Sequence, residues 1–376
     1  MRIPFNVPYV AISTENSVLE AIRAGTIQGD GPFTERCTEK LQAIINSRVL
    51  LTHSATAALE MSVRLSDIGD GDEVIVPDYT FPSSASAVAI TGARPIFVDV
   101  KRGSLNIDAA EVESAISERT RAIMVVHYGG VPADLGEIQA ISRQYGLEII
   151  EDAAQGFGVF YEGSHLGTIG RFGAISFHGT KNVQAGEGGA LLINDESDYH
   201  RAEIIREKGT DRSRYVRGET DRYTWQEVGS SFLPSELTAA YLIPQLDSHR
   251  EINEQRVDLW LFYRDELCDW AKTMGAYVVS ENQGTEGNGH IFALVFPSAE
   301  LASEFKKWMA FHGIQVSGHY SPLHQSKAGR TLGKMHGTME NSLNAGSGLV
   351  RLPMHFVAQE HRDFIVATAK GFGVLV

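Results

Sequence analysis

Between about residues 49 and 195 the chain alternates short apolar runs with longer amphipathic segments, and this alternation limits the possible folds most. The apolar runs are rich in branched residues and bounded by turn formers, as buried strands are. We expect strands at residues 73–77, 95–99, 122–126 and 147–151. We expect helices at residues 54–65, 81–91, 108–116 and 134–145. Strands separated by helices predict an α/β fold with a mostly parallel sheet covered on both faces.

The second part of the chain has a different pattern. Residues 236–261 form a long helical region leading out of the α/β part, and a smaller α+β segment follows. We expect strands in that segment near residues 291–296 and 313–317, with a helix at 298–311. A chain of 376 residues is long for one compact unit. The sequence therefore predicts a large domain at residues 1–245 and a small C-terminal domain at 246–376.

Composition excludes several classes of protein. The 33 Lys and Arg residues against 47 Asp and Glu give a net charge of −14, which argues against nucleic acid or an anionic membrane as partner. No apolar stretch approaches the roughly 20 residues of a membrane span, and the first residues do not resemble a signal peptide. Cys37 and Cys268 are too few for a disulfide framework or a cysteine metal site. We expect a cytoplasmic protein without a metal.

Lys181 is the first candidate for catalysis. It follows an apolar run at residues 173–177 and precedes a glycine-rich turn at 186–189. In a confined site, burial and nearby positive charge lower the pKa of a lysine, so that its free amine can form a Schiff base with a carbonyl group. The alternative is an ordinary exposed loop lysine.

Asp152 is the second candidate. It closes the predicted strand at residues 147–151, and small alanines follow it. A carboxylate at the end of a strand can pair with the protonated pyridine nitrogen of pyridoxal phosphate (PLP) and keep the ring an electron sink. Gln155 would then reach the phenolic oxygen of the ring. The alternative for Asp152 is a helix N-cap.

The start of the predicted helix at residues 54–65 is a candidate phosphate site. Ser54, Ala55 and Thr56 combine hydroxyl groups with small side chains, and free N–H groups at a helix start bind phosphate well. Ordinary capping by Ser54 is the alternative. Ser176 would add a further hydroxyl. Phe81, after the strand at residues 73–77, would stack on the pyridine face, although taken alone it fits a plain core position better.

With these residues together, the sequence resembles the DegT/DnrJ/EryC1/StrS family of sugar-nucleotide aminotransferases. The resemblance runs over nearly the whole chain. It rests on the segments at residues 29–34, 54–59, 77–81, 106–108, 127–130, 151–156, 176–182, 187–190, 319–324 and 351–353. Within the family it is most similar to the subgroup that makes dTDP-4-amino-4,6-dideoxygalactose, through residues 127–131, 202–210, 225–233 and 239–242.

The resemblance implies a fold-type I PLP enzyme that is a homodimer with active sites shared across the interface. Ser231 stands where family members place a residue against the partner's PLP phosphate, and His319 and Tyr320 would line the sugar site. The charged loop at residues 210–221, which has no obvious partner in its own domain, is a candidate interface loop. Lys181 rules against the 3-dehydrase branch, where a histidine replaces the lysine.

The implied reaction is ping-pong transamination with glutamate as amino donor and dTDP-4-keto-6-deoxyglucose as acceptor, the galacto product being favoured. Lys181 would move the proton between the cofactor carbon and sugar C4. A 3-aminotransferase acting on the 3-keto isomer is one alternative. Another is a non-catalytic PLP-binding regulator, which usually carries an additional DNA-binding domain. A nicotinamide-dependent sugar epimerase would need a glycine fingerprint, and the 69–72 segment does not match one.

Overall fold

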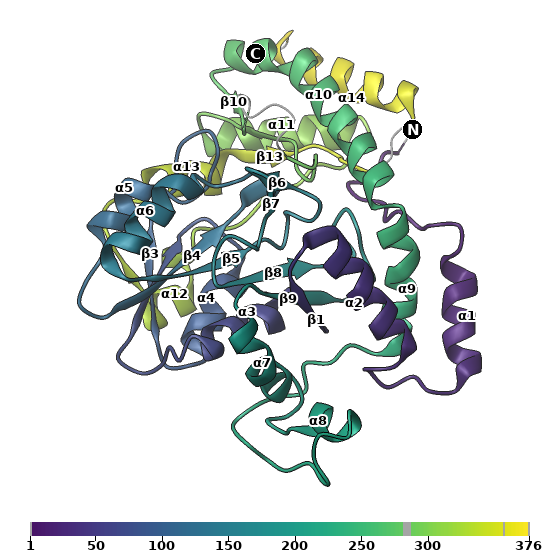
Figure 1. Ribbon diagram of the computed structural model, residues 1–376. Helices are drawn as coiled ribbons and strands as arrows, with labels where there is room; N and C mark the ends of the chain where they lie inside the picture. Colours follow the sequence, from purple (N-terminus) through teal and green to yellow (C-terminus); the bar gives the residue numbers. More distant parts are fainter. Residues whose placement is uncertain (1, 281–286, 356–357, 375–376) are drawn as a thin grey trace.

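A computed structural model describes residues 2–280, 287–355 and 358–374 (Figure 1). Its centre is an eight-stranded sheet with the order β1-β9-β8-β5-β4-β2-β3-β12. These strands are β1 (Arg48–Thr52), β2 (Glu73–Pro77), β3 (Arg94–Val98), β4 (Thr120–Val126), β5 (Glu148–Asp152), β8 (Phe172–Ser176), β9 (Gly189–Ile193) and β12 (Lys334–Met335). The run from β8 to β12 is parallel, whereas β9 lies antiparallel to both β8 and β1. The predicted mostly parallel sheet is confirmed.

Helices cover both faces of the sheet (Figure 1). Alternate side chains of a strand point to opposite faces, so Val74 and Val76 pack in one apolar cluster and Ile75 in the other. The cluster of Val74 includes α3 (Ala55–Leu65), α4 (Pro82–Ala89) and α7 (Tyr199–Arg206). The opposite cluster includes α1 (Thr14–Ala24), α2 (Pro32–Ile45), α5 (Ala109–Ser114), α6 (Leu135–Tyr145) and α9 (Glu236–Asp247). A two-stranded hairpin, β6 (Phe160–Tyr161) with β7 (Ser164–His165), lies outside the main sheet.

The long helical region expected at residues 236–261 is two helices. α9 ends at Asp247, and α10 (His249–Thr273) begins after Ser248. Pro244 lies inside α9 and has no N–H to donate to the fourth preceding residue. The carbonyl of that residue, Ala240, instead accepts a 2.7 Å hydrogen bond from the Ser17 hydroxyl of α1.

The C-terminal part has its own apolar cluster. A three-stranded antiparallel sheet, β10 (Tyr277–Val278), β11 (Ala293–Val295) and β13 (Leu349–Arg351), packs with α10, α11 (Ala299–Phe311) and α14 (Gln359–Gly371). The strand expected at residues 313–317 is wrong. This segment makes only isolated bridges, from Ile314 to Ile3 and from Ser317 to Arg351, because no continuous partner strand runs beside it.

The division at residues 245/246 stays a prediction, and contacts cross it in both directions. Ile3 pairs with residues 313–315, and β12 adds to the large sheet beside β3. Two carboxylates at the ends of strands in the large sheet accept hydrogen bonds from the segment after residue 318. Asp78, after β2, accepts hydrogen bonds from the backbone and ring nitrogens of His324 at 2.8 and 2.7 Å. Asp99, after β3, accepts from the first residues of α13 (Glu340–Gly348), which follows α12 (Lys327–Leu332).

The loop expected at residues 210–221 contains the short helix α8 (Arg212–Val216), which projects beyond α7 (Figure 1). The reading that its charges lack a partner nearby is wrong. The Arg217 guanidinium binds both carboxylate oxygens of Glu203 on α7, at 2.7 and 3.0 Å, and Arg212 binds Glu207 at 2.9 Å. Within the described residues no helix is both long and apolar enough to cross a bilayer.

Candidate active site

A cavity of about 570 Å³ opens at the carboxyl ends of three adjacent parallel strands. Val126, Asp152 and Ser176, the last residues of β4, β5 and β8, all line it. Ligands of open parallel sheets bind at this edge. Its remaining walls come from the start of α3, from α10, and from segments around residues 5, 81, 181, 290, 319 and 351. The cavity therefore joins residues of the central sheet to residues of the C-terminal part.

Lys181 lies in the turn after β8 and lines the cavity. The alternative of an exposed loop lysine is wrong. Burial lowers the pKa of Lys181 to about 8, with the Asp152 carboxylate opposing this shift and the Arg351 guanidinium adding to it. At pH 7 roughly a tenth of this amine is therefore uncharged, far more than for an ordinary lysine, and the uncharged amine is the form that acts as a nucleophile.

Asp152 ends β5 with its side chain at the cavity and only 5% of the residue exposed. The Ser84 hydroxyl donates a 2.7 Å hydrogen bond to Oδ2, and the backbone N–H of Ala154 donates to Oδ1 at 3.2 Å. The helix N-cap alternative is wrong, because a turn and no helix follows this residue. One fixed carboxylate thus faces the same space as the lysine.

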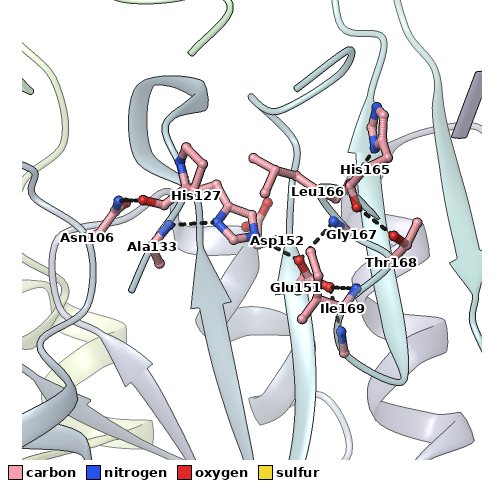
Figure 2. A network of polar contacts seen from close by, with 12 residues as sticks. Asn106, His127, Ala133, Glu151, Asp152, His165, Leu166, Gly167, Thr168 and Ile169 are labelled. Carbon is pink, nitrogen blue, oxygen red and sulfur yellow. Dashed lines mark hydrogen bonds and ion pairs between the residues drawn. The ribbon is translucent and has the colours of Figure 1, made fainter. Parts of the chain in front are cut away.

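The neighbouring residue, Glu151, points into a buried polar network that supports the end of β5 (Figure 2). Ala133 donates its N–H to Nδ1 of His127, so the ring proton lies on Nε2 and donates to Glu151 across 2.9 Å. The other donors to Glu151 are the backbone N–H groups of Gly167, Ile169 and Gly170. Burial would raise the pKa of Glu151, but these hydrogen bonds hold it below its ordinary value. The network fixes the strand that carries Asp152.

The start of α3 provides an anion cradle. The Ser54 hydroxyl accepts from the N–H of Ala57 at 3.1 Å, which confirms the ordinary capping role. Ala55 and Thr56 line the cavity at the first turn, where helix N–H groups favour a negative ligand. A Cβ at Gly189 would lie 2.3 Å from the carbonyl carbon of Ser54, so glycine is required for β9 to pass this turn.

Phe81 and Ser176 also line the cavity. Phe81 is 55% exposed, so the alternative that it belongs to the core is wrong. Ser176 accepts the N–H of His178 on its hydroxyl oxygen at 3.2 Å, which leaves its own hydrogen free to donate. These placements agree with a ring beside Phe81 and a phosphate near Ser176, although both roles stay predictions.

Gln155, His319 and Tyr320 form one wall with buried tyrosines. Gln155 accepts from the N–H of Gly129 at 2.7 Å and donates to the Tyr320 hydroxyl at 2.9 Å. The rings of His319 and Tyr320 stack with centroids 3.6 Å apart, and Tyr320 has a positive φ of 30°. Nδ1 of His319 lies 2.8 Å from the Tyr128 hydroxyl. Burial and the nearby Arg351 and Lys181 cations lower the pKa of His319 to about 2, so the ring is neutral.

Arg256, His290 and Arg351 are among the cavity residues that had no role assigned from the sequence. Arg351 donates to the carbonyl of Gly318 and lies 4.8 Å over the Phe5 ring. Arg256 is 9% exposed, and burial lowers its pKa to about 10. It has no hydrogen-bond or ion-pair partner in the part of the chain that the structure describes. Arg351 stands in one of the family segments, whereas Arg256 sits in a helix with no distinctive local pattern.

Ser231 does not line this cavity. It is exposed and forms a single β-bridge with Glu207. Its expected role is toward the site of a partner subunit, and that role stays a prediction.

Taken together, the donors in the cavity fit PLP. The start of α3 suits a phosphate, Lys181 suits an aldehyde carbon, and Asp152 suits a protonated pyridine nitrogen. The three features lie in one cavity, and the fixed carboxylate has no arginine or lysine ion-pair partner among the described residues.

Comparison with known proteins identifies a family of aminotransferases. The model of the DegT/DnrJ/EryC1/StrS aminotransferase family matches residues 10–369. An uncharacterized protein of Methanocaldococcus jannaschii is 30% identical over 328 residues, covering 85% of this chain and 84% of that protein. A DegT/DnrJ/EryC1/StrS aminotransferase from Brucella abortus has a similar structure, with a TM-score of 0.87 and 28% identity over 96% of this chain and 95% of that chain.

Two further solved structures add detail about relatives. A Streptococcus pneumoniae protein, named as a candidate sugar aminotransferase and solved in a PMP form, has a TM-score of 0.90 and 25% identity over 100% of this chain and 98% of that chain. DesV from S. venezuelae, solved in complex with a ketimine intermediate, has a TM-score of 0.86 and 27% identity over 96% and 94% of the two chains.

Proposed function

Because this chain belongs to the DegT/DnrJ/EryC1/StrS aminotransferase family, we propose that it is a PLP-dependent transaminase of a nucleotide-linked keto sugar. Its substrates in this proposal are glutamate and dTDP-4-keto-6-deoxyglucose, and its product is a dTDP-4-amino-4,6-dideoxyhexose with the galacto configuration favoured. Membership of the subgroup that makes this galacto sugar, and a cytoplasmic location, are part of the proposal.

One observation carries the proposal: Lys181, Asp152 and the start of α3 meet in one cavity. PLP bound there supplies an electron sink for the carbon that loses a proton. Lys181 provides the amine that holds the cofactor and, once free, moves the proton. Asp152 keeps the pyridine nitrogen charged, and Ala55, Thr56 and Ser176 bind the phosphate. Phe81 packs on the ring, and Gln155 holds the position of its phenolic oxygen.

The sugar is assigned to the wall formed by His319 and Tyr320. A neutral imidazole and a phenol offer hydrogen bonds to hydroxyl groups without adding charge. The S. pneumoniae relative that is named as a candidate sugar aminotransferase supports a sugar substrate. The position of the sugar over the cofactor ring decides both the product configuration and the choice between C4 and C3.

We further propose a homodimer in which Ser231 of each subunit contacts the cofactor phosphate of the other. Large apolar side chains near Ser231 are exposed in the single chain, with Trp225 at 75% and Val228 at 69%. Exposed apolar clusters of this kind favour a protein partner. A second copy would cover them and bring Ser231 toward the partner's cavity.

The test is product analysis. Purified enzyme is incubated with glutamate and either dTDP-4-keto-6-deoxyglucose or its 3-keto isomer, and NMR identifies the amino sugar. A 4-amino galacto product supports the proposal in full. A 3-amino product would replace the 4-keto assignment with the alternative regiochemistry. No amino sugar from either ketone, despite bound PLP, would favour a PLP-binding protein without catalysis.

A further inference from the structure

We propose that His290 is a positioning residue for Lys181: its Nε2 accepts a hydrogen bond from the lysine amine whenever that amine is released from the cofactor. This inference rests on the proposed aminotransferase function and concerns the proton transfer within it. His290 lies just before β11 and lines the same cavity as Lys181.

The tautomer of His290 is fixed by its neighbour Asn182, the residue directly after Lys181. The Asn182 amide nitrogen donates both its hydrogens, to Oδ1 of Asn253 and to the carbonyl of Asn288, each at 2.9 Å. The nitrogen of Asn182 is thereby used, and its Oδ1 faces Nδ1 of His290 at 2.9 Å. Because an amide oxygen only accepts, the proton of His290 must lie on Nδ1. Nε2 is left with a lone pair and no partner among the described residues.

A buried amide network holds this arrangement. Asn288, 3% exposed, donates to the carbonyls of Gln155 and Phe157 at 2.9 and 3.1 Å and accepts the backbone N–H of His290 on its Oδ1. Asn253 of α10 donates to the carbonyl of Phe157 as well. Every polar atom of the Asn288 amide is satisfied, so the network is rigid. It ties the segment of His290 to the turn after Asp152 and to the residue after Lys181.

Glycines allow this close approach. A Cβ at Gly130 would lie 2.3 Å from Oδ1 of Asn288, and one at Gly158 would lie 2.5 Å from the amide nitrogen of Asn253. Glycine is therefore required at both positions if the two amides are to pack against this backbone.

The lone pair of His290 lies in a cavity wall otherwise rich in donors. Lys181, Arg256 and Arg351 carry only hydrogens on their nitrogens, and the Asp152 carboxylate is engaged by Ser84 and Ala154. Burial, followed by the charges of Lys181 and Arg256, lowers the pKa of His290 well below its ordinary value, so the ring stays neutral. A neutral acceptor in the same cavity as the Lys181 amine can orient that amine toward the reacting carbon without holding it in an ion pair.

Two substitutions separate this role from a purely structural one. The amide nitrogen of asparagine overlays Nδ1 of histidine, so His290→Asn keeps the bond to Asn182 and removes the Nε2 acceptor. Glutamine reaches the position of Nε2, so His290→Gln keeps an acceptor there and loses the Asn182 bond. Thermal unfolding of the two holoenzymes controls for folding.

The first measurement is the rate of the donor half-reaction with ordinary and with 2-deuterated glutamate. The absorbance of the bound cofactor monitors the reaction. We expect His290→Asn to slow this step about tenfold or more and to increase the isotope effect, since proton transfer then limits the rate. His290→Gln should keep a rate closer to the wild type. Wild-type behaviour of His290→Asn, or equal loss in both variants without a change in isotope effect, would overturn the role.

The second measurement does not depend on turnover. In the pyridoxamine phosphate form of the holoenzyme Lys181 is a free amine, and trace labelling with an amine reagent across a pH series gives its pKa by mass spectrometry. Loss of the acceptor in His290→Asn should lower this pKa, whereas an unchanged value would contradict the proposal. If the wild type aminates no sugar, the proposed function fails, while the labelling result still decides whether His290 contacts Lys181.

Discussion

The hydroxyl of Ser84 donates a 2.7 Å hydrogen bond to the carboxylate of Asp152, although the two residues lie 68 positions apart in the chain. Ser84 belongs to α4, after β2, and Asp152 ends β5, two strands away in the sheet. Both side chains are nearly inaccessible to bulk solvent, at 0% and 5% exposure. The bond fixes the orientation of the carboxylate that we assign to the pyridine nitrogen.

Asp152→Asn should therefore retain PLP and lose most activity. The amide is nearly isosteric but cannot hold a proton on the pyridine nitrogen, and removal of one preorganised charge from an active site costs about 100-fold or more in turnover. Ser84→Ala is the matched control, because it removes one hydrogen bond and leaves the charge. Turnover near the wild-type rate in correctly folded Asp152→Asn would refute the assigned role.

Lys181→Ala should abolish transamination and remove the absorbance of the lysine-bound cofactor. Lys181 is the only nucleophile that we assign in the cavity, and burial lowers its pKa to about 8. The measurement is the visible spectrum of the purified protein together with turnover. Lys327→Ala, on the solvent side of α12, serves as the control and should behave as the wild type. An active Lys181→Ala protein with the same spectrum would show that another residue holds the cofactor.

Cofactor rebinding should depend on pH through Lys181. The free amine is the reactive form, and burial places the pKa near 8 rather than at the ordinary value of 10.5. When full-length apoprotein is mixed with PLP, the rate of spectral change should rise roughly tenfold per pH unit below 8 and level off above it. A rate that keeps rising beyond pH 9 would mean that Lys181 is not buried as described.

Glu236→Ala should destabilise the fold without acting on the cavity. The buried Glu236 carboxylate at the start of α9 accepts the backbone N–H groups of Gly31, Phe33 and Thr34 and also the Thr34 hydroxyl. Its removal leaves the first N–H groups of α2 without acceptors and should cost about 3 kcal/mol of unfolding free energy. Urea unfolding at fixed protein concentration measures this loss. Glu236→Gln keeps one acceptor oxygen and should lose less.

Mixed dimers test the shared site. Lys181→Ala chains and Ser231→Asp chains should each be inactive, the second because a carboxylate would repel the partner's cofactor phosphate. Subunit exchange between them should restore one good site per mixed dimer, up to about a quarter of wild-type activity for random pairing of equal amounts. Sedimentation verifies the dimer. An active monomer, or exchanged dimers that never regain activity, would contradict sharing while leaving the Lys181 assignment intact.

The sequence by itself predicted the parallel strands at the centre of the sheet and several residues that line the cavity, Lys181 and Asp152 among them. Branched apolar runs such as 73–77 have a periodicity that is a local property of the chain, so β2 was found where it was predicted. Asp152 follows such a run directly and Lys181 follows one a few residues later, and the carboxyl ends of parallel strands share one edge. Local patterns failed at residues 313–317, where the segment has no continuous partner strand. They also failed to predict that the helical region is interrupted at Ser248, between α9 and α10.

Only the tertiary structure decided which distant side chains complete the cavity. His290 and Asn182 are 108 positions apart, and the hydrogen bond that sets the tautomer of His290 has no signature in either local sequence. Arg256 looks like any helical arginine in the sequence, yet among the described residues it has no hydrogen-bond or ion-pair partner. Strand and helix preferences depend on a few neighbouring residues, whereas the tautomer, the pKa and the partners of a buried group depend on all the atoms packed around it.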